Sequence, residues 1–138
     1  MVYSPEYFDT LDSARSIVRS NLRADLRNSV TDSYLEEAVE MGELYTNSFL
    51  DSAAIDKDNL STTEKTNARN MSTVNSLIYI AGILPLTAEE KRDYLTQMKE
   101  RLEEAEVRFM KAKFPSSQVE SQYRRISPGY GRTWEEDS

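Results

Sequence analysis

The sequence predicts an all-α protein, a small helical bundle of about four helices with an extended C-terminal arm. Apolar residues recur three and four positions apart over most of residues 1–114, which is the period of an amphipathic helix. Glycine and proline number only four each in 138 residues, and this scarcity disfavours turn-rich β architecture. We therefore expect a helical bundle domain at residues 1–114 and an arm at residues 115–138.

The first helix is predicted to run from Ser4 to about Asn21. Ser4 can cap the helix, and Pro5 suits its first position because the N–H that proline lacks has no partner there. Its apolar face would consist of Tyr7, Leu11, Ala14, Val18 and Leu22.

Arginine recurs every four residues in this region, at Arg15, Arg19, Arg23 and Arg27. On one continuous helix these residues form a basic stripe, and a break near Ser20 would split the stripe into two pairs. Three interpretations stay open: a solvated face, ion pairs with an acidic helix within or between subunits, and phosphate binding.

A second helix is predicted to begin between Thr31 and Ser33. Ser33 and Glu36 fit a capping box, whereas Val30 packed on Leu35 would favour a start at Thr31. Its apolar residues are Leu35, Ala38, Val39, Met41, Leu44, Tyr45, Phe49 and Leu50. Its acidic residues, the expected complement of the arginine stripe, are Asp32, Glu36, Glu37, Glu40 and Glu43.

A loop over residues 51–61 is predicted to precede two further helices. Ser61 with Glu64 forms a capping box for the third helix, which should end at Leu84 before Pro85. A strand over residues 76–83 is the alternative, because this stretch is rich in residues that favour strands. A second capping box, at residues 87–90, opens a fourth helix that should continue to residue 114. Its apolar seam would consist of Leu95, Met98, Leu102, Ala105, Phe109 and Ala112.

Composition limits the chemistry that the chain can support. It contains no cysteine and no histidine, which excludes thiolate nucleophiles, Ser-His-Asp triads and sites ligated by these residues. The net charge is −7, and residues 1–60 hold 12 acidic and 5 basic residues, so nucleic-acid binding is not favoured. No run of 18 apolar residues and no signal-peptide pattern occur, and we expect no membrane association and no cofactor.

Two carboxylate motifs suggest an enzymatic alternative. Glu36-Glu37-Ala38-Val39-Glu40 and Glu90-Lys91-Arg92-Asp93 resemble the magnesium-binding ExxE and ExxD motifs of the MazG-like, all-helical nucleoside triphosphate pyrophosphohydrolases. The gap between the two motifs is longer here than in that family, and Glu90 already has a capping role. A third alternative is a small cytosolic helical interaction protein.

Residues 22–47 resemble the opening of the head–tail connector (adaptor, head-completion) proteins of tailed bacteriophages. Leu22-Arg23 matches a short "LR" segment, Asp32 to Leu35 matches a "D-x-x-L" helix start, and Glu43 to Thr46 matches an "E-x-Y-T" helix end. A loop, an apolar helix and a long amphipathic helix follow in both. The N-terminal extension over residues 1–27 is not standard for the family.

This resemblance implies a structural virion protein at the head–tail junction, present in the host cytoplasm during assembly, and not an enzyme. Family members form a ring, typically of twelve copies, that joins the portal protein to the tail or to the next connector layer, and DNA passes through the lumen without specific binding. The expected subunit interface is Arg15, Arg19, Arg23, Arg27, Glu36, Glu37, Glu40 and Glu43. The expected portal-binding residues of the arm are Tyr123, Arg124, Arg125, Ile126, Tyr130 and Trp134.

Overall fold

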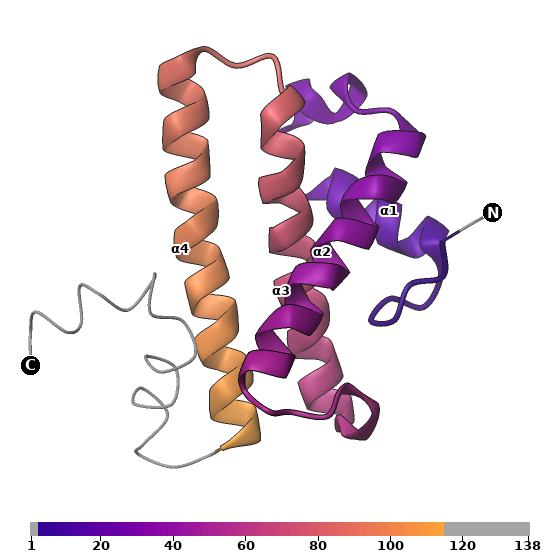
Figure 1. Ribbon diagram of the computed structural model, residues 1–138. Helices are drawn as coiled ribbons and strands as arrows, with labels where there is room; N and C mark the ends of the chain where they lie inside the picture. Colours follow the sequence, from indigo (N-terminus) through magenta and orange to yellow (C-terminus); the bar gives the residue numbers. More distant parts are fainter. Residues whose placement is uncertain (1–2, 115–138) are drawn as a thin grey trace, which may run out of the picture.

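The computed structural model describes residues 3–114, and the fold is all-α, as predicted (Figure 1). Strands are absent from this described range. The four α-helices are α1 (Leu11–Ser20), α2 (Asp32–Ser52), α3 (Thr62–Ile80) and α4 (Ala88–Lys113). Three short 3₁₀ helices connect them: η1 (Ala24–Ser29), η2 (Lys57–Asn59) and η3 (Ala81–Ile83).

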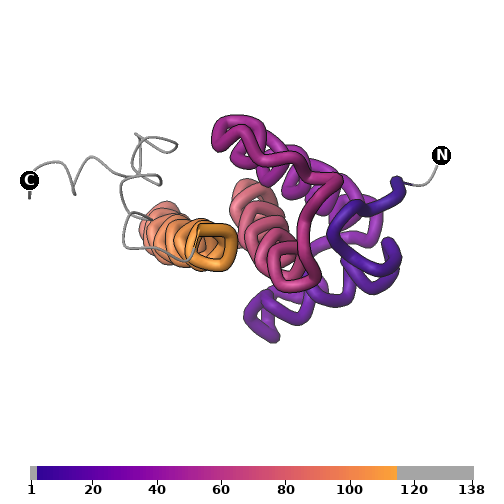
Figure 2. Tube along the Cα trace, turned by 90° about the horizontal axis from the view of Figure 1, so that it is seen from below, coloured from indigo at the N-terminus to yellow at the C-terminus, as the bar shows by residue number. Residues whose placement is uncertain are grey.

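Helix α3 is the central element of the bundle. Viewed from below, α3 lies between α4 on one side and the α1–α2 pair on the other (Figure 2). Every residue from Met71 to Leu77 is buried, so α3 is covered all round along this stretch. Residues 76–83 are helical and not a strand, because they continue α3 to Ile80 and then form η3. The α-helix therefore ends four residues before the predicted end at Leu84.

The core consists of two apolar clusters separated by a polar layer. The first cluster joins α1, the first half of α2 and the end of α3, and the second joins the end of α2, the start of α3 and the end of α4. Between them lies a buried polar seam, which we define as Gly42, Thr46, Ser72, Asn75 and Ser76. Its hydroxyls are paired, because Thr46 Oγ1 lies 2.8 Å from Ser72 Oγ and Ser76 Oγ donates to the Ala38 carbonyl at 2.9 Å.

The seam requires glycine at position 42. A Cβ atom there would lie 2.5 Å from the Ser72 carbonyl oxygen and 3.0 Å from the Ser76 backbone nitrogen, and it would also overlap Ser76 Oγ. The α2 and α3 backbones therefore approach at Gly42 more closely than any side chain permits.

Both capping boxes at the starts of the last two helices are confirmed. Ser61 Oγ accepts from the Glu64 N–H at 3.2 Å, and Glu64 Oε1 accepts from the Ser61 N–H at 2.8 Å. The same reciprocal pair joins Thr87 and Glu90 at 3.0 and 3.1 Å. Helix α2 begins at the earlier of its two predicted starts, with the Thr31 hydroxyl as its cap.

The predicted start of the first helix is wrong, because residues 3–10 are not helical and α1 begins at Leu11 with Thr10 as its cap. The backbone N–H groups of Glu6 and Tyr7 donate to the Glu43 carboxylate of α2, at 2.9 and 2.7 Å, which holds this segment against α2. Tyr7 and the adjacent Phe8 are both buried, in different clusters of the core. Consecutive side chains of a helix lie only about 100° apart, so the non-helical backbone here lets the two rings enter different clusters.

Candidate functional site

The arginines of the predicted stripe do not share one helix, because α1 ends at Ser20. Arg15 and Arg19 lie on α1 and face the first turns of α2. Arg19 pairs with Asp32 at 2.8 Å, and Arg15 pairs with Glu36 at 3.6 Å and with Asp12 on its own helix. Of the three interpretations, ion pairing within the chain describes these two residues.

Arg23 and Arg27 form the second pair, beyond the end of α1. Arg23 pairs with Asp25 at 2.7 Å, and both side chains are largely exposed. Arg27 donates to the carbonyls of Leu22 and Ser20 at 3.0 and 3.1 Å, and its own carbonyl accepts from Arg19. Arg27 thus binds the carbonyls that the end of α1 exposes, a role that basic side chains often have at helix ends.

The four predicted interface glutamates have different environments. Glu43 is fully buried and accepts hydrogen bonds from the Tyr3 hydroxyl and from the N–H groups of Glu6 and Tyr7. Glu36 is half-buried beside Arg15, whereas Glu37 and Glu40 are exposed. A contact with another copy of the chain is therefore open to Glu37 and Glu40 but not to Glu43.

Large apolar side chains are exposed on α2. Leu44 is 53% and Tyr45 50% exposed, although their spacing had placed them among the apolar residues of this helix. Tyr34 of α2 stacks on Tyr79 of α3, with ring centroids 5.6 Å apart. We call Tyr34, Leu44, Tyr45 and Tyr79 the α2 aromatic face. Desolvation, and then hydrogen bonding to Glu37, raises the pKa of the Tyr79 hydroxyl, so this acid lies against the aromatic face.

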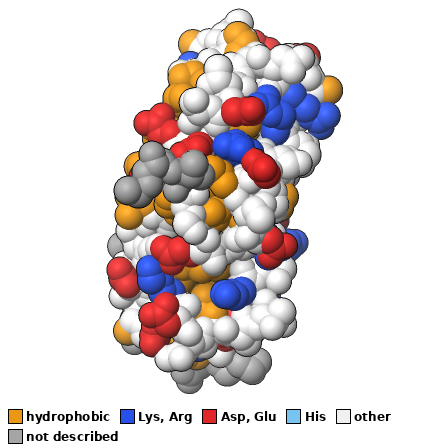
Figure 3. Space-filling view, turned by 90° about the vertical axis from the view of Figure 1, so that its right-hand side faces the viewer, with side chains coloured by type: hydrophobic (Ala, Val, Ile, Leu, Met, Phe, Trp, Pro, Cys, Tyr) orange, Lys and Arg blue, Asp and Glu red, His pale blue; other side chains and the backbone are white. Residues whose placement is uncertain are grey.

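Acidic and basic side chains alternate over the neighbouring surface. Figure 3 views the molecule from the side on which Figure 1 places α1 and the N-terminal segment. Blue and red side chains lie next to one another there, with apolar surface between them. Arg15, Arg19 and Arg23 each pair with an acid, so the arginines do not form a surface of one sign.

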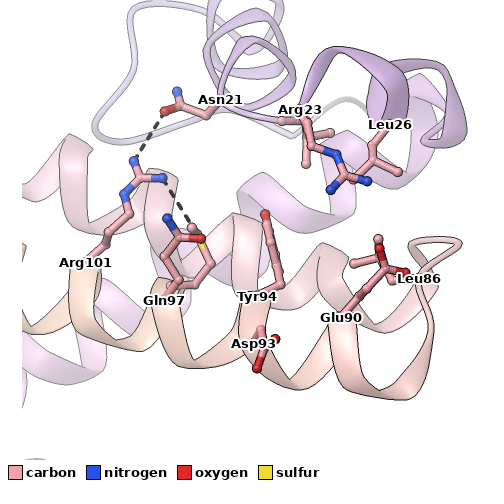
Figure 4. A pocket seen from close by; sticks show the side chains of 11 residues that line it. Asn21, Arg23, Leu26, Leu86, Glu90, Asp93, Tyr94, Gln97 and Arg101 are labelled. Atoms are coloured by element: carbon pink, nitrogen blue, oxygen red, sulfur yellow. Dashed lines mark hydrogen bonds between the residues drawn. The ribbon is translucent and has the colours of Figure 1, made fainter.

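A groove separates α4 from residues 21–26. Its upper part is a cavity of about 480 Å³, and a second hollow of about 280 Å³ shares Asn21 and Arg101 with it. The apolar lining of the cavity is Leu22, Leu26, Leu86 and Met98. Figure 4 shows the Tyr94 side chain rising from α4 toward the opposite wall. Its hydroxyl is buried and has no hydrogen-bond partner among residues 3–114, and burial raises its pKa.

The two carboxylate motifs do not form a metal site in the part of the chain that the structure describes. Across residues 3–114, no group of three or more acidic residues is placed to hold a metal ion. The first motif lies on α2 and the second at the start of α4, on opposite sides of α3 (Figure 2). Glu90 binds the Thr87 N–H as part of the capping box.

The predicted portal-binding residues, Tyr123 to Trp134, lie outside the described residues. Among the described helices, none is long and apolar enough to cross a membrane. Comparisons with protein-family models, with curated proteins and with solved structures give no match. The resemblance on residues 22–47 therefore stays a prediction from the sequence.

Sequence reasoning missed two features, the buried Glu43 and the groove beside α4. The burial of Glu43 could have been predicted from helical spacing, because it lies four residues after Val39 and seven before Leu50, both buried on the core side of α2. The groove had no such indication, since its walls are 60 or more residues apart in the sequence. The Arg101–Asn21 hydrogen bond, at 3.3 Å, joins these two walls.

Proposed function

We propose that this chain is a structural virion protein, a ring-forming head–tail connector subunit that joins a portal protein to the tail. The α2 aromatic face is the observation that carries the proposal. Leu44 and Tyr45 are half-exposed in the described chain, and aromatic side chains are enriched where protein surfaces meet. The second support is the match of residues 22–47 to the connector pattern.

A ring requires a heterologous contact, in which two different surfaces of each copy meet. The α2 aromatic face with exposed Glu37 and Glu40 would supply one surface. The other would be the arginine-bearing side around Arg23, whose pair with Asp25 is exposed and open to exchange. Exposed ion pairs contribute only about 0–1 kcal/mol each, so they would select the partner surface while the apolar contact holds it.

The self-association half of the proposal is tested by a double substitution, Leu44→Glu with Tyr45→Glu. Both side chains are already half in solvent, so the helical circular dichroism and the thermal transition should be retained. We expect loss of the ring in native mass spectrometry and electron microscopy. Lys99→Glu, with the same total charge change at an exposed position of α4, is the matched control and should leave assembly unchanged. Equal assembly by the double variant would refute a role for this face.

The portal half of the proposal concerns the arm. Deletion of residues 119–138 should leave the helical bundle intact and abolish a stable complex with portal protein, and substituting Tyr130 and Trp134 by alanine should weaken that complex. Portal binding by the truncated chain would refute the assignment of the arm. We expect no catalysis. Magnesium-dependent pyrophosphate release from a nucleoside triphosphate, abolished by Glu37→Gln or Glu40→Gln, would favour the enzymatic alternative instead.

A further inference from the structure

We propose that the groove beside α4 binds the C-terminal segment of the same chain, with the Trp134 side chain in the cavity and the acids that follow it on Arg101. The inference concerns the free subunit and is independent of the connector proposal. It rests on an unpartnered buried hydroxyl, an unpaired arginine and the composition of the segment.

The Tyr94 hydroxyl is the first observation. It has no partner among residues 3–114 and less than 1 Å² of exposed surface, whereas buried polar groups in folded proteins are almost always paired. The cavity that Tyr94 lines is also lined by Leu22, Leu26 and Met98, which belong to the first apolar cluster. A large apolar group with one hydrogen-bonding atom fits this lining. An indole has this composition, because its N–H is a donor that needs an acceptor when buried.

Arg101 is the second observation. Its guanidinium lines both hollows and donates to Asn21 Oδ1 at 3.3 Å, and no acid among residues 3–114 pairs with it. Arg108, farther along the groove, also lacks an acidic partner in that range. A partly buried arginine that has no carboxylate partner can bind the carboxylate of another segment, since charge-assisted hydrogen bonds are about twice as strong as neutral ones.

The acids of the groove do not pair with these arginines among residues 3–114. Glu104 lines the second hollow beside Arg101 and Arg108 but forms an ion pair with neither. Glu90 is engaged in the capping box with Thr87. The Asp93 carboxylate points away from the opposite wall (Figure 4). The part of the lining that faces the cavity thus combines apolar surface, an unpaired hydroxyl and a cation.

The C-terminal segment matches this combination in sequence. Trp134 is the single tryptophan of the chain, and Glu135, Glu136 and Asp137 follow it directly. An indole placed in the cavity with its N–H on the Tyr94 hydroxyl would bring the first of these acids to Arg101. Tryptophan, tyrosine and arginine are the residue types that contribute most to interface hot spots.

The segment is also long enough to reach the cavity of its own chain. Phe114 is the last described residue, and the 20 residues from position 115 to Trp134 follow it. Fully extended they span roughly 66 Å, whereas the stretch of α4 from Lys113 back to Tyr94 is about 29 Å long. Tethering makes the contact intramolecular, with an effective concentration up to the order of 1 mM, so a weak site is occupied.

The first experiment uses full-length protein and the fluorescence of its single tryptophan. We expect the Trp134 emission to be blue-shifted, and its quenching by acrylamide to be several-fold weaker than in urea. Arg101→Glu and Tyr94→Phe should each shift the emission to the red and raise the quenching. Lys99→Glu, an equal charge change at an exposed position of the same helix, is the matched control and should do neither. A Trp134 signal insensitive to the two groove variants overturns the proposal.

The second experiment locates the contact and identifies which copy makes it. The chain has no cysteine, so an introduced pair reports one distance without background. Gln97→Cys with Glu135→Cys should form a disulfide within the monomer under mild oxidation. Ser48→Cys with Glu135→Cys, on the α2 surface, should not. A covalent dimer would assign the groove to a second copy, and equal yields in both pairs would show no preferred site; either result contradicts the proposal. Neither readout involves portal or ring assembly.

Discussion

Gly42→Ala should destabilise the fold by about 2–4 kcal/mol, although alanine is the better helix former. The added Cβ would lie 2.5 Å from the Ser72 carbonyl oxygen, whereas carbon–oxygen contacts normally start near about 3.3 Å. Helices α2 and α3 must therefore separate by nearly 1 Å. Overpacking of this kind costs about 1–3 kcal/mol, and the weakened seam hydrogen bonds of Thr46 and Ser76 add about 1 kcal/mol each. The helix propensity of alanine offsets about 1 kcal/mol.

Urea unfolding followed by far-ultraviolet circular dichroism measures this change. The midpoint should fall at an unchanged slope, and the melting temperature should drop by roughly 8–16 °C for a chain of this length. Gly82→Ala is the matched control, because no atom lies within 4 Å of a Cβ added there. It should be neutral or slightly stabilising. Adding Ser76→Ala to Gly42→Ala should rescue only partly, since the Ser72 carbonyl belongs to the backbone. Wild-type stability of Gly42→Ala would refute the reasoning.

Three further predictions follow from the N-terminal segment and the end of α2. Glu43→Gln should lower the free energy of unfolding by about 1–3 kcal/mol and speed amide hydrogen exchange over residues 3–8, and unchanged exchange would contradict it. Burial raises the pKa of the Tyr3 and Tyr7 hydroxyls, and the next largest causes are Glu43 for Tyr3 and Glu6 for Tyr7. The free energy of unfolding should therefore keep its full value below about pH 10 and fall above it, because the unfolded state loses these protons first. The fall should be smaller in Tyr3→Phe. Ala54 has a φ of 57°, so Ala54→Gly should stabilise the protein by about 1 kcal/mol in the same urea assay, and a loss of stability would count against this.

Helix starts were predictable where the signal is local. Ser61 with Glu64 and Thr87 with Glu90 each contain, within four residues, the donors and acceptors that fix the start of a helix. Lys113 approaches the Glu64 carboxylate at 3.8 Å, but at the oxygen that the capping bond does not use, and both boxes form as the sequence indicates. Burial of Leu11, Ala14 and Val18 on α1, and of Leu22 just beyond it, followed equally well from helical periodicity.

The start of the first helix was not predictable from its own residues. Ser4 and Pro5 fit a helix N-terminus, but Tyr7 and Phe8 are buried in different core clusters, and the N–H groups of Glu6 and Tyr7 bind Glu43, 36 or 37 positions away in the sequence. A buried carboxylate needs several donors, and the Tyr3 hydroxyl with the N–H groups of Glu6 and Tyr7 supplies them. The tertiary contact therefore prevailed over a local preference.

The exposure of Leu44 could have been predicted from its angular position around the helix, though not from apolar spacing alone. It follows Gly42 by two positions, about 200° around a helix with 3.6 residues per turn. Since Gly42 faces α3 at the seam, Leu44 must point away from the bundle. An apolar residue at that angle has no place in the monomer core, which is why it bears on the assembly proposal.

The two sides of α3 explain why stability and binding can be tested separately. On one side, Gly42 brings the α2 backbone against α3, so any change there disturbs the whole core. On the other, α4 packs on α3 but leaves the groove between itself and residues 21–26. Arg101 and Tyr94 lie in that groove, outside both apolar clusters, although Tyr94 packs against the first. Substitutions at Gly42 should therefore shift the unfolding transition without a specific effect on the Trp134 emission of the folded protein. Substitutions in the groove should shift the Trp134 emission with little change in the unfolding transition.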